Sequence, residues 1–327
     1  MVAALGGEPR LIAREGRRPR FSPDGNQLAY WMGATGTGLI PGSMKIYVAA
    51  LEGGQPRQVH PEFVSARHPV WMPDGKRLLF WGRLDAKTPP DWWVAPVDGS
   101  APVTTGALDA IRARNLSLPP GEYAIYPETL AAEGDRVFFS HVSSGGRRVL
   151  LESSGSPESI ILADVASARI VDLIQSPDPK FIPFAARFSP DDRWIAFHVR
   201  TTNPMARQIL ITPFRGGQVC GPEEWIAVTD GSTMDRESYW SPDGSLLYFL
   251  SERDGFRCIW AQRLHAETKR PLGSAFAVHH FHHARRSLTG GGGSPGAIGM
   301  CVTPDSIVFA LAELTGNIWS ADLGGRK

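Results

Sequence analysis

Trp240-Ser241-Pro242-Asp243-Gly244, followed by the apolar run Leu246-Leu247-Tyr248-Phe249, is the stretch of sequence that decides the fold. Proline presets φ for the first position of a tight turn, aspartate bonds its own downstream backbone, and glycine accepts a positive φ. The stretch therefore predicts a hairpin turn between two strands. We expect its aspartate to be a turn residue and not a catalytic one.

The same pattern recurs along the whole chain. Most copies keep the Pro-Asp pair, whereas the copy near residue 132 has lost its proline and the copy near residue 304 its glycine. Repeats of 50 to 62 residues have the length of a propeller blade with four antiparallel strands and long loops. The repeat therefore predicts an all-β fold, a six-bladed β-propeller with four-stranded blades. The six turns lie near residues 23, 73, 132, 190, 242 and 304, with spacings of 50 to 62 residues.

Each turn is followed by a further apolar run, which we expect to be the third strand of its blade. The aromatic residue two positions before each proline is expected to pack between neighbouring blades. The third-strand runs are residues 45–48, 92–95, 160–163, 208–211, 258–261 and 317–320, and fourth strands are expected at 56–59 and 101–104.

The two ends of the chain predict how the ring closes. The last repeat reaches Asp322-Leu323-Gly324-Gly325, where a fourth strand should begin. Residues 6–12 resemble residues 53–59, which supply a fourth strand to the first repeat. We therefore expect one domain over residues 1–327, in which an N-terminal strand at about residues 9–13 closes the last blade. This arrangement removes exposed sheet edges from the ring.

The charge and composition of the chain exclude several function classes. Lys and Arg number 34 against 33 Asp and Glu, so there is no long-range attraction to nucleic acid. No apolar run has the length of a membrane span, and the start lacks the basic region of a signal peptide. Taken literally, the chain is cytoplasmic. Because residues 6–10 already belong to repeat sequence, the alternative is an extracytoplasmic domain of a longer, membrane-anchored protein.

The three cysteines, Cys220, Cys258 and Cys301, lie far apart in the sequence. We expect small buried apolar residues, with a single disulfide as the alternative.

The Phe/Trp-Ser-Pro-Asp-Gly repeats, with third strands such as Ile46-Tyr47-Val48, resemble the PD40, or TolB-like, propeller family over nearly the whole chain. Residues 280–288 and 313–319 are similar to a narrower subgroup, in which the propeller is attached to bacterial winged-helix regulators or Ser/Thr kinases. The resemblance implies an extracytoplasmic sensing or protein-docking domain. We find neither a helix-turn-helix region nor kinase motifs in the sequence itself.

No segment predicts a catalytic centre. Gly292-Gly293-Ser294-Pro295-Gly296 matches the nucleophile elbow Gly-x-Ser-x-Gly, but Pro295 has no N–H to contribute to an oxyanion hole. We interpret this run as a glycine-rich loop. No cofactor is expected.

The run from His279 to His283 is the densest group of metal-ligating side chains in the sequence. His280 and His282 would share one face of a strand and form part of a zinc site, given a third ligand from elsewhere. Related TolB-like propellers that cleave pectic oligosaccharides use clustered histidines with a metal. However, Arg285-Arg286 would repel a cation, and the sequence favours a solvated edge strand.

The positions five and six residues before each turn proline, which we call the rim positions, should enter the first strand of each blade. First strands surround the central channel of a propeller, so these side chains should converge at one mouth. Their hydrogen-bond donors could bind a protein, a peptide or a small anionic ligand. The alternative is that these are surface arginines without a binding role. The rim residues of interest are Arg17, Arg18, Arg67, His68, Tyr126, Phe184, Arg236 and Glu237.

These observations favour a non-catalytic ligand- or protein-binding propeller, such as the sensor domain of a bacterial signalling protein. The alternative from another class is a metal-dependent oligogalacturonate-type lyase or a hydrolase. It would require His68 or the run 279–283 to meet further ligands at the channel. A third interpretation is a structural scaffold like TolB itself, which binds partners without a small-molecule pocket.

Overall fold

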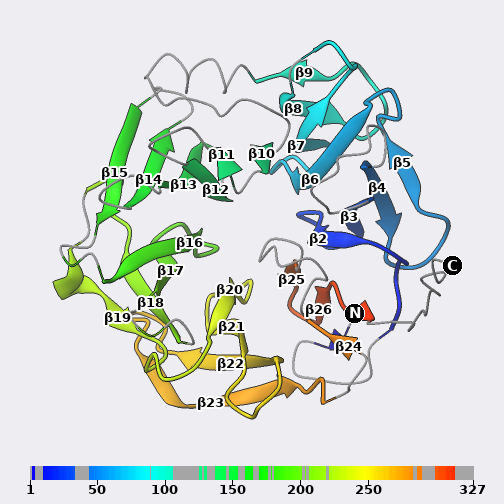
Figure 1. The fold of residues 1–327 in the computed structure, drawn as a ribbon. Helices are drawn as coiled ribbons and strands as arrows, with labels where there is room; N and C mark the ends of the chain where they lie inside the picture. Colours follow the sequence, from blue (N-terminus) through cyan, green and yellow to red (C-terminus); the bar gives the residue numbers. More distant parts are fainter. Residues whose placement is uncertain are drawn as a thin grey trace, which may run out of the picture.

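A computed structural model gives the structure of the chain. The residues that it describes are 2–3, 10–33, 44–88, 90–105, 125–126, 129–130, 137–144, 147–153, 159–164, 169–175, 178, 180–200, 203, 206–218, 221–282, 286–288 and 299–313. They form antiparallel sheets arranged in a ring (Figure 1). Across these residues, no helix is long and apolar enough to cross a membrane.

Four of the sheets are four-stranded and follow the order of the chain from the ring axis outward. The first blade comprises β2 (Arg17–Phe21), β3 (Gln27–Met32), β4 (Lys45–Ala50) and β5 (Arg57–Val59). The second comprises β6 (Ser65–Trp71), β7 (Arg77–Arg83), β8 (Asp91–Pro96) and β9 (Val103–Thr104). The fourth comprises β16 (Ile182–Phe188), β17 (Trp194–Arg200), β18 (Arg207–Pro213) and β19 (Ile226–Ala227), with the short helix η2 (Pro222–Glu224) before β19. The fifth comprises β20 (Arg236–Trp240), β21 (Leu246–Ser251), β22 (Cys258–Leu264) and β23 (Pro271–His279).

The remaining sheets depart from the four-stranded pattern. The third blade has six strands, β10 (Ile125–Tyr126), β11 (Thr129–Leu130), β12 (Val137–Val142), β13 (Arg148–Ser153), β14 (Ser159–Asp164) and β15 (Arg169–Gln175). A three-stranded sheet, which we call the terminal sheet, has the order β1 (Val2–Ala3), β26 (Ser306–Phe309), β25 (Met300–Val302). A separate pair joins β24 (Arg286–Ser287) to β27 (Ala312–Glu313).

The expectation of six four-stranded blades is therefore corrected, because the described residues form five blades of four or more strands. The terminal sheet contains the sixth turn copy and lies between the fifth and first blades (Figure 1). Its expected third strand, residues 317–320, lies outside the described residues. The place of that strand beside β26 is taken by β1.

The N-terminus joins the terminal sheet, but not through the residues that the sequence suggested. Val2 pairs with Ile307 and Ala3 with Ser306, so that β1 lies beside β26. Residues 10–13 form no strand, and position 9 lies outside the described residues. A proline at position 9 has no N–H for a strand ladder, whereas the β-branched Val2 suits one.

The predicted chemistry of the repeated turn is confirmed. The Ser241 hydroxyl donates to Asp243 Oδ1 at 2.5 Å and accepts from the Leu246 N–H at 2.9 Å. Asp243 Oδ1 also accepts from the Ser245 N–H at 3.0 Å, and Gly244 has a φ of 67°. The copies around residues 22–27 and 189–194 repeat the serine–aspartate contacts. The turn aspartates thus hold the hairpins, as expected.

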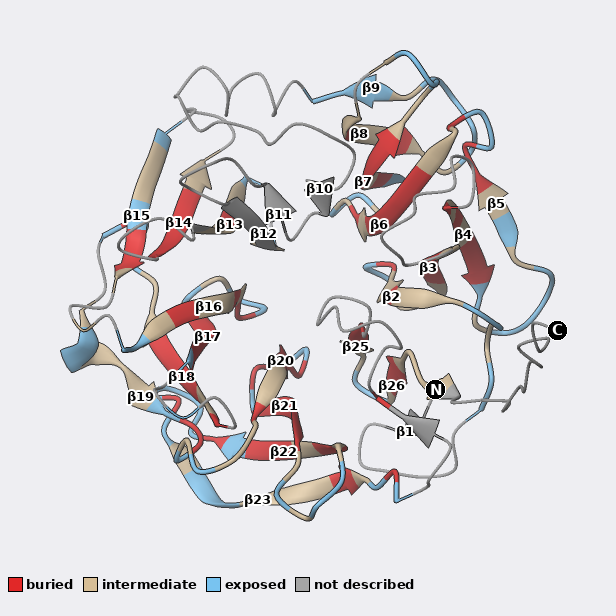
Figure 2. Ribbon diagram, in the orientation of Figure 1, coloured by how far each residue is buried: buried red, intermediate tan, exposed pale blue. Residues whose placement is uncertain are grey.

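Aromatic residues bind neighbouring blades to each other. The indole N–H of Trp71 donates to the Arg20 carbonyl of the first blade at 3.0 Å, and that of Trp240 to the Arg187 carbonyl of the fourth blade at 3.4 Å. Both tryptophans are buried, as is most of β17 and β21 (Figure 2). Apolar clusters of described residues join the first blade to the second, the third to the fourth, the fourth to the fifth, and the fifth to the terminal sheet. The packing fixes the positions of the innermost strands, which carry the candidate site.

Candidate functional site

The innermost strand of four blades carries a β-bulge at the same place. The strand register shifts between Arg17 and Arg20 in β2, and at the equivalent positions of β6, β16 and β20. In each case the residue five positions before the turn proline adopts a left-handed φ. Bulges of this kind re-aim side chains and concentrate at functional sites. The left-handed residues are Arg18 (48°), His68 (57°), Ala185 (53°) and Glu237 (55°).

Side chains from these strands form a connected group. The Arg187 guanidinium carbon lies 4.1 Å from the centre of the Tyr239 ring, and Arg187 Nη2 lies 3.8 Å from Glu237 Oε2. The Tyr239 hydroxyl donates to Glu237 Oε2 at 3.3 Å and accepts from the Met300 N–H at 3.1 Å. Arg20 Nη1 in turn donates to the Met300 carbonyl at 3.3 Å. The contacts thus run from the fourth blade through the fifth and the terminal sheet to the first.

Arg18 belongs to the same group on electrostatic grounds. Burial lowers the pKa of Arg18 to about 9, and the positive charges of Arg20 and Arg187 contribute in the same direction. Glu237 and Tyr239 oppose them. We call Arg18, Arg20, Arg187, Glu237 and Tyr239 the axial cluster. The axial cluster thus contains three arginines and one glutamate, and Arg187 is the arginine that lies beside the glutamate carboxylate.

The positive charge of the axial cluster lowers the pKa of two histidines, His68 and His141. Burial lowers the pKa of His68 well below its usual range, and Arg18, Arg67 and Arg20 lower it further. Burial lowers the pKa of His141, in β12, to about 3, helped by Arg187 and Arg20. The Phe188 N–H donates to His141 Nδ1 at 3.3 Å, so His141 of the third blade contacts the innermost strand of the fourth. Both histidines are therefore neutral at neutral pH.

Of the eight rim residues predicted from the sequence, Arg18 and Glu237 join the axial cluster, with His68 beside it. The Arg67 side chain is buried, and its Nη1 donates to the Met44 sulfur at 3.5 Å. Arg236 Nη2 lies 4.0 Å from Glu252 Oε1 in its own blade.

Two further rim residues, Arg17 and Phe184, contact groups outside the axial cluster. Arg17 donates to the Gly33 carbonyl at 3.1 Å, and Phe184 meets the His198 ring edge to face at 5.4 Å. Tyr126 lies in β10, but its side chain is outside the described structure. A binding role for the eight residues stays a prediction.

Sequence reasoning missed three members of the axial cluster: Arg20, Arg187 and Tyr239. All three stand three residues before a turn proline, so the same offset argument could have found them. It did not, because it considered only positions five and six, where the chain enters the first strand of each blade.

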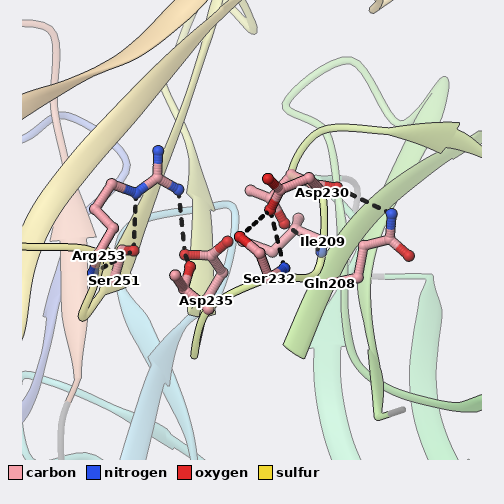
Figure 3. Close-up of polar contacts among 9 residues, drawn as sticks. Gln208, Ile209, Asp230, Ser232, Asp235, Ser251 and Arg253 are labelled. Carbon is pink, nitrogen blue, oxygen red and sulfur yellow. Dashed lines mark hydrogen bonds and ion pairs between the residues drawn. The ribbon is translucent and has the colours of Figure 1, made fainter. Parts of the chain in front are cut away.

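The loop before β20 holds the fifth blade in place through its own polar contacts (Figure 3). Arg253 Nη2 donates to Asp235 Oδ1 at 3.2 Å, and Arg253 Nε donates to the Ser251 hydroxyl at 3.0 Å. Nearby, the Ser232 hydroxyl donates to Asp230 Oδ1 at 2.7 Å. Asp235 is fully buried, so its pairing with Arg253 compensates a charge that would otherwise be costly.

A second group of polar side chains lies farther from the ring axis, where β23 leaves the fifth blade. His280 Nδ1 lies 2.8 Å and His282 Nε2 2.9 Å from the same oxygen, Oδ2 of Asp254. The Cys258 thiol completes the group, which we call the outer cluster; its four ligand atoms all lie within 4.8 Å of one another. The sequence suggested the two histidines but not their partners.

Other sequence expectations fall partly outside the described structure. Cys258 is buried, Cys301 is partly buried, and both are free thiols. Cys220, Ser294 and the run 283–285 lie outside the described residues.

Comparison with known proteins identifies the fold. No protein-family model matches the chain, and no curated protein matches it. Among solved structures, a TolB of Agrobacterium tumefaciens is similar over 80% of both chains, with 16% identity and a TM-score of 0.51. TolB from Acinetobacter baumannii is similar over 88% of this chain and 61% of its own, with 14% identity and a TM-score of 0.52. The propeller domain of the Trilobed protease of Pyrococcus furiosus is similar over 82% and 85%, with 12% identity and a TM-score of 0.51. The chain thus has a TolB-like β-propeller fold.

Proposed function

We propose that this chain is a non-catalytic binding propeller that recognises an anionic group at the axial cluster. The observation that carries the proposal is the gathering of three arginines with one glutamate in the axial cluster, where Arg187 Nη2 lies 3.8 Å from Glu237 Oε2 and the buried Arg18 is subject to the charges of Arg20 and Arg187. Like charges brought together at a partly buried site cost free energy through mutual repulsion. An anionic ligand would relieve that repulsion, and burial would strengthen each interaction.

The chemistry of the cluster favours a carboxylate or a phosphate. Guanidinium groups bind both in a bidentate geometry, and Tyr239 adds an aromatic surface beside Arg187. A small anion or an acidic segment of a partner protein would satisfy these donors. A docking or sensing role, outside the cytoplasm if the chain belongs to a longer protein, agrees with the resemblance to TolB-like propellers.

The same proposal counts the terminal sheet as a sixth blade. Its turn copy near residue 304 has the spacing of the others, and β25 contacts both β2 and β20. The ring would then enclose the axial cluster on all sides.

The alternative of a metal-dependent lyase or hydrolase receives less support. It needs a cation at the ring axis, where His68 experiences the positive charges of Arg18, Arg20 and Arg67. These charges oppose cation binding there.

The test measures binding of inorganic phosphate and of a hexaglutamate peptide by calorimetry at two salt concentrations. We expect wild-type binding to weaken as salt rises, because exposed charges are screened. The double variant Arg20→Ala with Arg187→Gln should bind at least about 10-fold more weakly. The matched control is Arg193→Ala with Arg270→Ala, two exposed arginines outside the cluster. Equal binding by the two double variants, or no binding by wild type, would refute the proposal.

A further inference from the structure

The outer cluster consists of four side chains that converge from two segments of the fifth blade. Asp254 lies in the loop between β21 and β22, and Cys258 begins β22. His280 and His282 follow the end of β23. The sequence separates the two pairs by more than twenty residues, and the antiparallel pairing of β22 with β23 brings them together.

The geometry within the outer cluster is that of metal ligands more than of a simple ion pair. One carboxylate oxygen of Asp254 faces both imidazoles, and His280 Nδ1 also lies 3.2 Å from His282 Nε2. If both ring nitrogens donate to the carboxylate, their two protons must face each other. A single cation replaces both protons and uses the lone pairs of all three atoms.

The size of the outer cluster fits a zinc ion. Zinc bonds of about 2.0–2.3 Å in a tetrahedron place ligand atoms roughly 3.3–3.8 Å apart. The four ligand atoms lie within 4.8 Å of one another, and the three nitrogen and oxygen atoms are 2.8–3.2 Å apart. Side-chain adjustments of roughly an ångström would therefore complete the coordination.

Supporting contacts hold each ligand in place. The Phe281 N–H donates to Cys258 Sγ at 3.3 Å, which fixes the position of the sulfur. The His282 ring lies 4.5 Å from that of Phe256, and the His280 ring 5.9 Å from that of Trp260. Such outer contacts orient metal ligands and are part of functional metal sites.

The charges around the outer cluster do not oppose a cation. Arg253 pairs with Asp235, and Arg257 pairs with Glu252, so the basic residues flanking Asp254 are compensated. The sequence predicted that Arg285 would repel a cation at the histidines, but Arg285 lies outside the described residues.

We propose that Asp254, Cys258, His280 and His282 form a tetrahedral zinc site that fastens the exit of β23 to the β21–β22 hairpin. Imidazole and thiolate ligands favour Zn²⁺ over Mg²⁺ or Ca²⁺, which prefer oxygen. Four protein ligands leave no open position for a substrate, so the site is structural. The proposal is independent of the anion-binding function.

The test uses the full chain, freed of metal with EDTA, and titrates ZnCl₂ against a chromophoric chelator. We expect one zinc ion per chain and a higher melting temperature with zinc. CoCl₂ should give a thiolate-to-cobalt charge-transfer band, which is absent in Cys258→Ser. His280→Gln with His282→Gln should weaken zinc binding by at least about 100-fold. These histidine side chains are 47% and 45% exposed, so their loss should leave the fold intact.

His265→Gln and Cys301→Ser are the matched controls, because both residues lie outside the outer cluster, and they should bind zinc as wild type does. The proposal is wrong if wild type binds no stoichiometric zinc, or if the histidine double variant keeps wild-type affinity. It is also wrong if the cobalt complex of wild type lacks the thiolate band.

Discussion

The guanidinium of Arg187, in β16, lies over the ring of Tyr239, in β20, with its central carbon 4.1 Å from the ring centre. This cation–π contact joins the innermost strands of two adjacent blades. The Tyr239 hydroxyl continues the connection by accepting from the Met300 N–H of β25. Tyr239 therefore has two roles: its hydroxyl stabilises the contact between blades, and its ring orients Arg187 of the proposed anion site.

Tyr239→Phe should remove the role of the hydroxyl and keep that of the ring. The ring and its contact with Arg187 remain, whereas the buried Met300 N–H loses its acceptor. An unsatisfied buried donor costs about 1–3 kcal/mol, so we expect the free energy of unfolding to fall by that amount in urea titrations. Tyr47→Phe is the control, because Tyr47 stacks on Tyr30 and the described residues give its hydroxyl no hydrogen-bond partner. Equal stability of the two variants would contradict the proposed role of the hydroxyl.

Stability should fall in acid partly because of His198. This residue is 1% exposed, and its Nε2 accepts from the Ser238 N–H at 3.2 Å. Burial, with the charges of Arg187, Arg236 and Arg207, lowers the pKa of His198 to about 3. Below pH of about 6.5 the unfolded chain binds a proton that the folded chain excludes. The contribution of His198 to the free energy of unfolding is therefore fully present above pH of about 6.5. It is lost as the pH falls toward about 3, by at most about 1.4 kcal/mol per pH unit.

His198→Gln keeps an acceptor for Ser238 and removes this titration. We expect its free energy of unfolding to depend less steeply on pH between about 6.5 and 4 than that of wild type. His265→Gln, an exposed turn variant, should keep the wild-type slope. The assignment fails if the His198→Gln slope equals that of wild type.

Gly299→Ala should disturb the boundary between the terminal sheet and the first blade. A Cβ at this position would lie 2.5 Å from the Arg18 Cα, which is too close for any side chain. Overpacking of this kind costs about 1–3 kcal/mol, measured as a lower melting temperature. Because the clash is with backbone, the further change Arg18→Ala should not restore stability. Full rescue by that second change would show that only the arginine side chain is in the way.

Much of the fold could be predicted from the sequence because its signals are local. Pro-Asp-Gly turns and the apolar runs after them depend on φ preferences and on contacts within a few residues. The structure confirms the turns near residues 23, 73, 190 and 242 and the third strands at residues 45–48, 92–95, 208–211 and 258–261. The expected third strand at residues 160–163 was wrong, because β13 takes that place in the third blade and these residues lie in the next strand, β14. The N-terminal strand was misplaced, because pairing at a sheet edge depends on which segment reaches it and not on local pattern.

The candidate sites depended more on tertiary structure. The rim positions of four blades share the same bulge, but their side chains have different surroundings. Arg67, six residues before its turn proline, contacts Met44, whereas Arg18, five residues before its own, is left-handed and belongs to the axial cluster. Side-chain direction after a bulge cannot be read from a period of two. Likewise, His280 and His282 were visible in the sequence, whereas Asp254 and Cys258 join them only because β22 pairs with β23. The sequence alone determined which residues turn and which extend; the packing of strands distant in the chain decided which charged and metal-ligating groups meet.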